Sequence, residues 1–148
     1  MFQGENAITI DDKGRLAIPT AYRDLVAQAC GNRLVVTYDV YNAGCLWLLQ
    51  YDHWQRLCKQ LESKGMQSPQ ARTLRRKLVA AAAVVELDGN SRISVPASMR
   101  AMTGIERRAV LLGNIDRFEL WSERDYQAQM QTPLGDVDLE DGLKDLEL

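Results

Sequence analysis

The sequence predicts an α+β protein, mainly β, built from two tandem copies of one strand–turn–strand–helix unit. Three observations support this. A motif occurs twice, IDDKGRLAIP at residues 10–19 and LDGNSRISVP at residues 87–96, at a shift of 77 in the numbering. Apolar residues alternate on both sides of the turn in each motif, and a stretch with helical spacing follows each one. The chain is therefore expected to contain an internal duplication.

Each copy begins with a predicted hairpin and a helix. In the first copy the strand, turn, strand and helix are expected at residues 6–10, 11–14, 15–18 and about 20–29. In the second copy they are expected at residues 84–87, 88–91, 92–95 and about 98–102. Pro19 and Pro96 end the second strands, because proline cannot donate a hydrogen bond to a sheet.

Alternation in the second strand of the hairpin separates apolar side chains from an arginine. Leu16 and Ile18 are expected to point to one side of the strand, whereas Arg15 and Ala17 point to the other. Arg15 is therefore expected on the outer face, and its counterpart in the second copy is Arg92. A further arginine follows at the same distance in each copy, at Arg23 and Arg100.

The second half of each copy is expected to form another apolar hairpin and a helix. Residues 34–39 match residues 111–116 at the same shift of 77, and residues 46–49 match residues 118–121 at a shift of 72. The five extra residues of the first copy are assigned to the loop from Val40 to Gly44. Helices are expected at residues 52–61 and 122–130, the second with a capping box formed by Ser122 and Asp125.

These patterns divide the chain into four segments. They are a first repeat, a connecting helix, a second repeat and an acidic tail, at residues 1–62, 63–83, 84–130 and 131–148. The helix begins at Ser68-Pro69 and runs to about Ala83. It carries a basic cluster formed by Arg72, Arg75, Arg76 and Lys77. This cluster is interpreted as a solvated face of the helix, and the alternatives are a contact with phosphates or a subunit boundary.

The charge is unevenly distributed. The net charge of the 148 residues is −2, but residues 136–148 hold six acidic residues and one lysine, which leaves 17 basic and 14 acidic residues in the rest. The body is thus mildly basic. The tail is expected to be disordered. The alternative is that it competes with DNA phosphates for the basic face of the body. No apolar run approaches the length of about 20 residues that a membrane span needs, and no leader peptide is recognised, so a cytoplasmic protein is expected.

Residue patterns typical of enzymes are not found in the sequence. Cys30, Cys45 and Cys58 are too far apart in the chain to match a zinc or redox motif, and they are expected to pack as apolar side chains. His53 is the only histidine and is assigned a structural role. No phosphate loop or nucleophile elbow is present. We therefore expect no catalytic residue, metal, cofactor or small-molecule substrate.

The repeated arginine fits DNA recognition. A guanidinium group can donate two hydrogen bonds to guanine, with about 1–3 kcal/mol of discrimination, and a two-stranded β-ribbon fits the major groove. Arg15 and Arg92 suit this role. Lys13 would place a positive charge near a phosphate, and the backbone of the adjacent Gly14 is expected to be free to contact DNA. The alternative is that each arginine only braces its own turn through Asp11 or Asp88. The duplication favours DNA binding.

The sequence resembles the MraZ family of bacterial transcription regulators over residues 1–130. The resemblance rests on four motifs: Met1-Phe2-x-Gly4, Asp11 to Pro19, Arg92-Ile93-x-Val95-Pro96 and Cys45-Leu46-Trp47-Leu48. It implies two swapped-hairpin (SpoVT-AbrB-like) units that form a pseudo-twofold barrel with flanking helices, and a ring-like homo-oligomer. It also implies binding to direct repeats in promoter DNA upstream of the cell-division and cell-wall gene cluster, usually as a repressor, and association with the nucleoid.

The resemblance also implies the residues that face DNA. They are Lys13, Gly14, Arg15 and Arg92, to which the repeated positions Arg23, Arg100 and Asn90 are added. Asn90 and Ser91 replace the pair ending in glycine that is usual in the family, so the second loop is expected either to contact DNA more weakly or to serve in subunit packing. A protein-binding module, such as an antitoxin with an acidic tail, is the alternative function.

Overall fold

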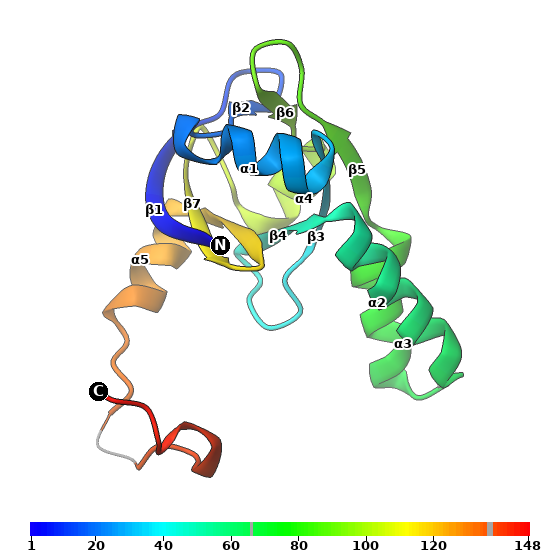
Figure 1. Cartoon of the computed structure of the whole chain (residues 1–148), viewed down its shortest axis with the longest axis vertical. Helices are drawn as coiled ribbons and strands as arrows, with labels where there is room; N and C mark the ends of the chain where they lie inside the picture. The colour runs from blue at the N-terminus through cyan, green and yellow to red at the C-terminus, as the bar shows by residue number, and fades with distance from the viewer. Residues whose placement is uncertain (66, 136–137) are drawn as a thin grey trace.

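The computed structural model describes residues 1–65, 67–135 and 138–148 (Figure 1). Its strands are β1 (Phe2–Thr9), β2 (Arg15–Ala17), β3 (Arg33–Tyr38), β4 (Cys45–Gln50), β5 (Ala83–Glu86), β6 (Arg92–Ser94), β7 (Arg108–Ile115) and β8 (Arg117–Ser122). Its helices are α1 (Thr20–Cys30), α2 (Tyr51–Lys64), α3 (Pro69–Arg75), the π-helix η1 (Arg76–Ala80), α4 (Ala97–Thr103), α5 (Glu123–Gln131) and the 3₁₀-helix η2 (Asp141–Leu143). The predicted mixture of helices and strands is confirmed.

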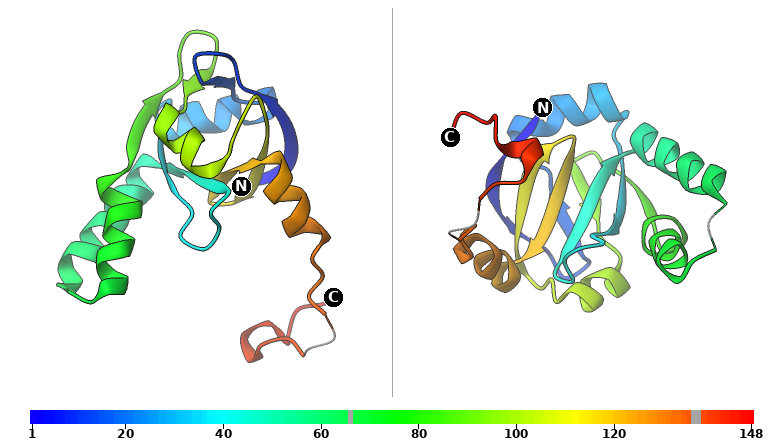
Figure 2. Two further views of the ribbon diagram at one scale, coloured as in Figure 1. Left: turned by 180° about the vertical axis from the view of Figure 1, so that it is seen from behind. Right: turned by 90° about the horizontal axis from the view of Figure 1, so that it is seen from below.

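The strands form one antiparallel sheet and one small ribbon. The sheet has the order β1-β7-β8-β4-β3-β5, and β2 pairs only with β6 within the described part of the chain. The closed barrel that the resemblance implied is not present, because the edge strands β1 and β5 are not paired with each other in the residues described. Instead, β2 contacts β1 and β6 contacts β5, and Figure 1 shows the ribbon between these two strands, while Figure 2 shows the sheet from two further sides.

Strands of the two copies are exchanged. β1 of the first copy pairs with β7 of the second, and β5 of the second copy pairs with β3 of the first. The expected pairing of β1 with β2, and of β5 with β6, is therefore wrong. Only the turns themselves are closed, by hydrogen bonds of 3.0 Å from Asp11 N to Arg15 O and 2.9 Å from Asp88 N to Arg92 O. Exchange buries Leu16 and Ile93 opposite each other in a common core.

The register shows that the alignment of the two copies needs one correction. Leu34 of β3 pairs with Val85 of β5, and Ala109 of β7 pairs with Ile8 of β1. Since Val85 corresponds to Ile8 at the shift of 77, the counterpart of Leu34 is Ala109, at a shift of 75 rather than 77. Relative to the second copy, the first copy therefore has two extra residues before β3 and three extra residues in the β3–β4 loop. The first insertion lies in the region of the helix, since α1 is 11 residues long and α4 only 7.

The later hairpins and helices agree with the sequence prediction. β3 pairs with β4 and β7 with β8, and each hairpin leads into a helix, α2 or α5. Ser122 caps α5, since its Oγ accepts a hydrogen bond of 3.2 Å from Asp125 N. The connecting helix is capped by Ser68 but ends at Ala80, three residues earlier than expected. Helices α2 and α3 project together from one side of the body (Figure 1).

The core holds the inner face of the ribbon in place. Leu16, Ile18 and Ile93 are at most 1% exposed and belong to one cluster with Phe2 and Phe118, whose ring centroids are 4.4 Å apart. Burial of each such side chain contributes roughly 1.5–3 kcal/mol to folding. The turns that follow β1 and β5 are thus carried on a rigid base.

The tail is only partly described. Positions 136 and 137 of the predicted acidic tail lie outside the described residues. Beyond them, η2 forms and its residues are exposed to solvent. Disorder of the tail and the four-segment division of the chain stay predictions. In the described ranges, no helix has the length and apolar character needed to cross a lipid bilayer.

Candidate nucleic-acid interface

Two equivalent loops project from the same end of the molecule. The first loop (residues 11–14) joins β1 to β2, and the second loop (residues 88–91) joins β5 to β6. Figure 1 shows the two tips side by side beyond the ribbon, on the opposite end from the α2–α3 pair. The repeated motif of the sequence is therefore displayed twice on one surface.

The carboxylate of Asp11 organises the first loop. Its Oδ1 accepts hydrogen bonds from Lys13 N at 2.9 Å and from Arg15 N at 2.8 Å. Its Oδ2 accepts a hydrogen bond from Arg15 Nε at 2.8 Å. Gly14 N donates to the carbonyl oxygen of Asp11 at 3.0 Å. A short aspartate side chain thus satisfies the turn's backbone donors, as is common in Asx turns.

The second loop repeats this bonding pattern. Asp88 Oδ1 accepts from Asn90 N at 2.8 Å and from Arg92 N at 3.0 Å, and Oδ2 accepts from Arg92 Nε at 3.2 Å. Ser91 N donates to the carbonyl oxygen of Asp88 at 3.0 Å. The ion pair between aspartate and arginine that the bracing interpretation requires is therefore present in both copies.

Bracing leaves part of each guanidinium available. The ion pairs use Nε, and the arginine side chains are 32% and 31% exposed for Arg15 and Arg92. Within the described residues, no hydrogen bond or ion pair involves the two terminal nitrogens of either group. Because Asp11 and Asp88 already restrict the orientation of the fork, less rotamer entropy is lost when it binds a base. Bracing and binding are thus compatible.

The ribbon presents both arginines on its outer face. Arg15 is opposite Ser94, and Arg92 is opposite Ala17, with the buried pair Leu16 and Ile93 between them. Ala17 and Ser94 are exposed and small, so each arginine has an open neighbour across the ribbon. A two-stranded β-ribbon can enter the major groove of DNA. Sequence periodicity placed the arginines outward, but it did not reveal that they share one ribbon.

The other predicted residues take different positions. Lys13 and Asn90 are exposed at the loop tips. Arg23 and Arg100 are partly buried, and their Nε atoms donate to the carbonyl oxygens of Ile18 at 2.9 Å and Val95 at 3.1 Å. These two arginines therefore bind the chain just beyond β2 and β6.

Gly14 has a structural role that the sequence did not indicate. Its φ is +79°, and a Cβ at this position would lie 2.8 Å from both Val95 O and Arg100 Nε. Its carbonyl oxygen accepts a hydrogen bond of 2.9 Å from Val95 N. The expectation of free backbone at Gly14 is wrong, because both its N–H and its carbonyl group are already bonded. Gly14 joins the first loop to the second copy.

The two aspartates give the loops a pH dependence. The backbone hydrogen bond from Arg15 is the largest cause that lowers the pKa of Asp11 below its ordinary value of 3.8, and Arg92 has the same effect on the pKa of Asp88. A carboxyl with a lowered native pKa stabilises the fold above pH 3.8 and loses this contribution as the pH falls through the native pKa.

We therefore expect the free energy of unfolding to decrease below about pH 4, in part through Asp11 and Asp88. Urea unfolding at pH 7 and at pH 3 measures the change. The double variant Asp11→Asn, Asp88→Asn should lose part of this pH dependence. An identical pH dependence in the variant and the unchanged protein would show that the two carboxylates do not contribute.

The three cysteines and the histidine are at least partly buried. Cys30 and Cys45 are buried and Cys58 is partly buried, and burial raises the pKa of each thiol. Burial likewise lowers the pKa of His53, whose Nδ1 lies 3.9 Å from Asp116 Oδ2. No group of three potential metal ligands is found among the residues described.

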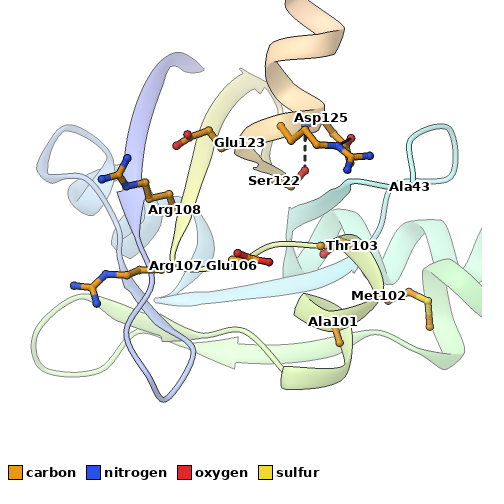
Figure 3. A pocket seen from close by; sticks show the side chains of 12 residues that line it. Ala43, Ala101, Met102, Thr103, Glu106, Arg107, Arg108, Ser122, Glu123 and Asp125 are labelled. Carbon is orange, nitrogen blue, oxygen red and sulfur yellow. Dashed lines mark hydrogen bonds and ion pairs between the residues drawn. The ribbon is translucent and has the colours of Figure 1, made fainter.

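A cavity with a volume of about 850 Å³ lies between α4 and α5. Its lining mixes charges of both signs, including Glu106, Arg107, Arg108, Glu123 and Asp125 (Figure 3). Arg107 and Arg108 were not singled out from the sequence. In the sequence, they appear only as two adjacent arginines after the helix predicted near residues 98–102. This pattern does not indicate which of the two loops they lie beside.

Comparison with known proteins identifies the family. A family model described as "MraZ protein, putative antitoxin-like" matches residues 1–77 and 78–140. The chain is 58% identical to the transcriptional regulator MraZ of Stenotrophomonas maltophilia and 53% identical to that of Xylella fastidiosa strain Temecula1, each over 148 residues and the full length of both chains. It is 37% identical to the transcriptional regulator MraZ of Tolumonas auensis over 153 residues, again with full coverage.

These relatives are named as regulators of transcription, a class of protein that is not an enzyme class. The match extends over the complete length of the relatives, well beyond the two arginine-bearing motifs. The chain belongs to the MraZ family.

Proposed function

We propose that this chain is a DNA-binding transcriptional regulator, mainly a repressor, that reads direct repeats upstream of the cell-division and cell-wall gene cluster, including its own promoter. The names of its relatives support the regulatory class. The observation that carries DNA binding is the ribbon β2–β6, which presents Arg15 and Arg92 on one outer face with matched aspartate braces.

The residues take different roles in this proposal. Arg15 and Arg92 donate to base edges in the major groove, and Lys13 and Asn90 contact phosphates from the loop tips. Arg23 and Arg100 position the strands through the carbonyl groups of Ile18 and Val95. Gly14 lets the first loop approach Val95 closely and makes no contact with DNA itself.

A ring-like homo-oligomer strengthens binding in this proposal. One ribbon offers few base contacts, so a single unit would bind weakly. Several linked units on consecutive repeats convert later contacts into intramolecular ones and can raise the avidity by about 10² to 10⁴. Such a regulator would act in the cytoplasm, associated with the nucleoid.

Genomic capture tests the proposed target. The purified protein is incubated with fragments of the genome that encodes it, and the retained fragments are sequenced. Enrichment of one promoter region with spaced copies of a short element is expected. Retention without any shared element would contradict recognition of direct repeats.

Binding should weaken strongly with salt. Lys13 and other basic residues that neutralise phosphates release counterions, and an assembly with about six or more such contacts loses on the order of 10³-fold in affinity between 50 and 200 mM salt. Fluorescence anisotropy with a captured fragment measures this at several salt concentrations. Affinity that stays constant over this range would exclude an interface rich in phosphate contacts.

An antitoxin-like protein-binding module is the second candidate, favoured by the description of the matching family model. Size-exclusion chromatography of protein purified from its own host separates the two functions. A large homo-oligomer favours the DNA regulator. A dimer that elutes with a second small protein in fixed proportion favours the antitoxin.

A further inference from the structure

We infer that Arg107 and Arg108 bind DNA phosphates beside the first loop, so that the pseudo-symmetric molecule binds DNA in one preferred orientation. This inference rests on the proposed function and adds two contact residues to it. It depends on the position of the pair, on the lack of competing partners, and on a comparison with the corresponding positions in the other copy.

The backbone of the pair is fixed at the base of the first loop. Ile10, the residue before Asp11, donates its N–H to the carbonyl oxygen of Arg107 at 2.7 Å. Arg108 begins β7 and is opposite Thr9, the last residue of β1. The two arginines therefore flank the strand that enters the first loop, and they move with it as one unit.

The side chains of the pair are available to a ligand. Arg107 and Arg108 are exposed, and neither makes a side-chain hydrogen bond or an ion pair within residues 1–65, 67–135 and 138–148. Both arginines line the edge of the cavity, and in Figure 3 their side chains extend past β1 in a similar direction, apart from Glu106. Two adjacent cations with this orientation suit the phosphates of a DNA backbone.

The second loop has no such pair. The register makes Asn32 and Arg33 the counterparts of Arg107 and Arg108, since Leu87 N donates to Asn32 O at 2.9 Å and Arg33 is opposite Glu86. Asn32 carries no charge. The Arg33 guanidinium stacks on the ring of Tyr51, with Cζ 4.2 Å from the ring centroid. The strand that enters the second loop therefore has no unengaged arginine at these positions.

The loops themselves do not compensate for this difference. In the first loop Asp12 and Lys13 cancel each other, and the corresponding Gly89 and Asn90 of the second loop are uncharged. The difference between the surroundings of the two loops thus lies in the two unengaged guanidinium groups of Arg107 and Arg108. A pseudo-twofold protein whose two loops bind DNA equally well would suit a palindromic site. Two unequal loops suit direct repeats, on which every protein unit has the same orientation.

The test compares two adjacent arginine pairs in the full-length protein. Arg107→Ala, Arg108→Ala removes the proposed contacts, and Arg75→Ala, Arg76→Ala removes the same charge from two exposed positions, the end of α3 and the start of η1. Affinity for a captured genomic fragment is measured at several salt concentrations. The first variant should reduce the slope of log affinity against log salt by about 0.9 for each phosphate that is no longer neutralised, with an unchanged preference among sequences. The second variant should keep the slope, and both should keep the thermal unfolding midpoint.

An equal reduction of the slope in both variants, or none in the first, would overturn the inference. Arg15→Ala separates this failure from failure of the proposed function. If Arg15→Ala abolishes specific binding while Arg107→Ala, Arg108→Ala has no effect, the function stands and the inference is wrong. If neither variant affects binding, both are wrong.

Phosphate-ethylation interference on a single repeat tests the orientation directly. Interference should be stronger at one end of the repeat, and the two ends should become similar in the Arg107→Ala, Arg108→Ala variant. Equal interference at both ends with the unchanged protein would overturn the preferred orientation.

Discussion

Arg15→Ala is expected to abolish specific promoter binding while the protein stays folded. Removal of a bidentate contact to a base costs about 1–3 kcal/mol of discrimination, or roughly 5- to 150-fold in affinity, and an oligomer on several repeats multiplies this effect. The substitution removes one partly exposed ion pair, whose contribution to stability is about 0–1 kcal/mol. Anisotropy with a captured fragment measures the affinity, and urea unfolding measures the stability.

Two further variants show whether specific binding depends on the two parallel hydrogen bonds of the Arg15 guanidinium group or only on its charge. Arg15→Lys keeps the charge but cannot donate two parallel hydrogen bonds, so it should retain non-specific binding and lose specificity. Arg124→Ala removes an arginine whose side chain is 95% exposed and that lies on α5, away from the loops, so it should bind like the unchanged protein. Unchanged specific affinity of Arg15→Ala would show that this side chain does not read the bases.

Gly14→Ala is expected to lower both the stability and the DNA affinity. A non-glycine residue at a φ of +79° is strained by about 1–3 kcal/mol, and its Cβ would lie 2.8 Å from the carbonyl oxygen of Val95. The hydrogen bond from Val95 N to Gly14 O would then lengthen, and the first loop would shift away from the second copy. Urea unfolding and anisotropy measure the two effects.

Gly89→Ala is a control glycine substitution in the other loop, at the position that corresponds to Asp12. A Cβ at Gly89 would meet no atom within 4 Å, and its φ does not lie in the left-handed region. This substitution should change the free energy of unfolding by less than about 0.5 kcal/mol. If Gly14→Ala were as harmless as Gly89→Ala, the close approach of the first loop to Val95 and Arg100 would not be important for folding or binding.

Local features of this fold could be predicted from the sequence because they depend on neighbouring residues. Alternation placed Leu16 and Ile18 in the core and Arg15 outside, as the structure confirms. Spacing of four residues allowed Asp11 to brace Arg15, and this ion pair is present. The duplication was visible because the turn tolerates few residue types, so both copies keep the aspartate and the arginine.

Long-range features could not be predicted in the same way. Periodicity shows that a segment is a strand but not which strand it pairs with, so the residue pattern alone did not predict that β2 pairs with β6, and only the family resemblance implied swapped hairpins. The shift of 75 between β3 and β7 depends on the length of α4, which the alternating pattern of the strands does not record. The contact between Gly14 and Arg100 joins residues of different copies, and only the fold brings them together.

Hydrogen–deuterium exchange on the complex with captured DNA tests the central claim most directly. If the ribbon and its loops enter the major groove, exchange should slow at residues 11–17 and 88–94 when DNA is added, with little change at α2 and α3. Slower exchange confined to the α2–α3 pair, with both loops unchanged, would contradict the account, because DNA would then bind the other end of the molecule.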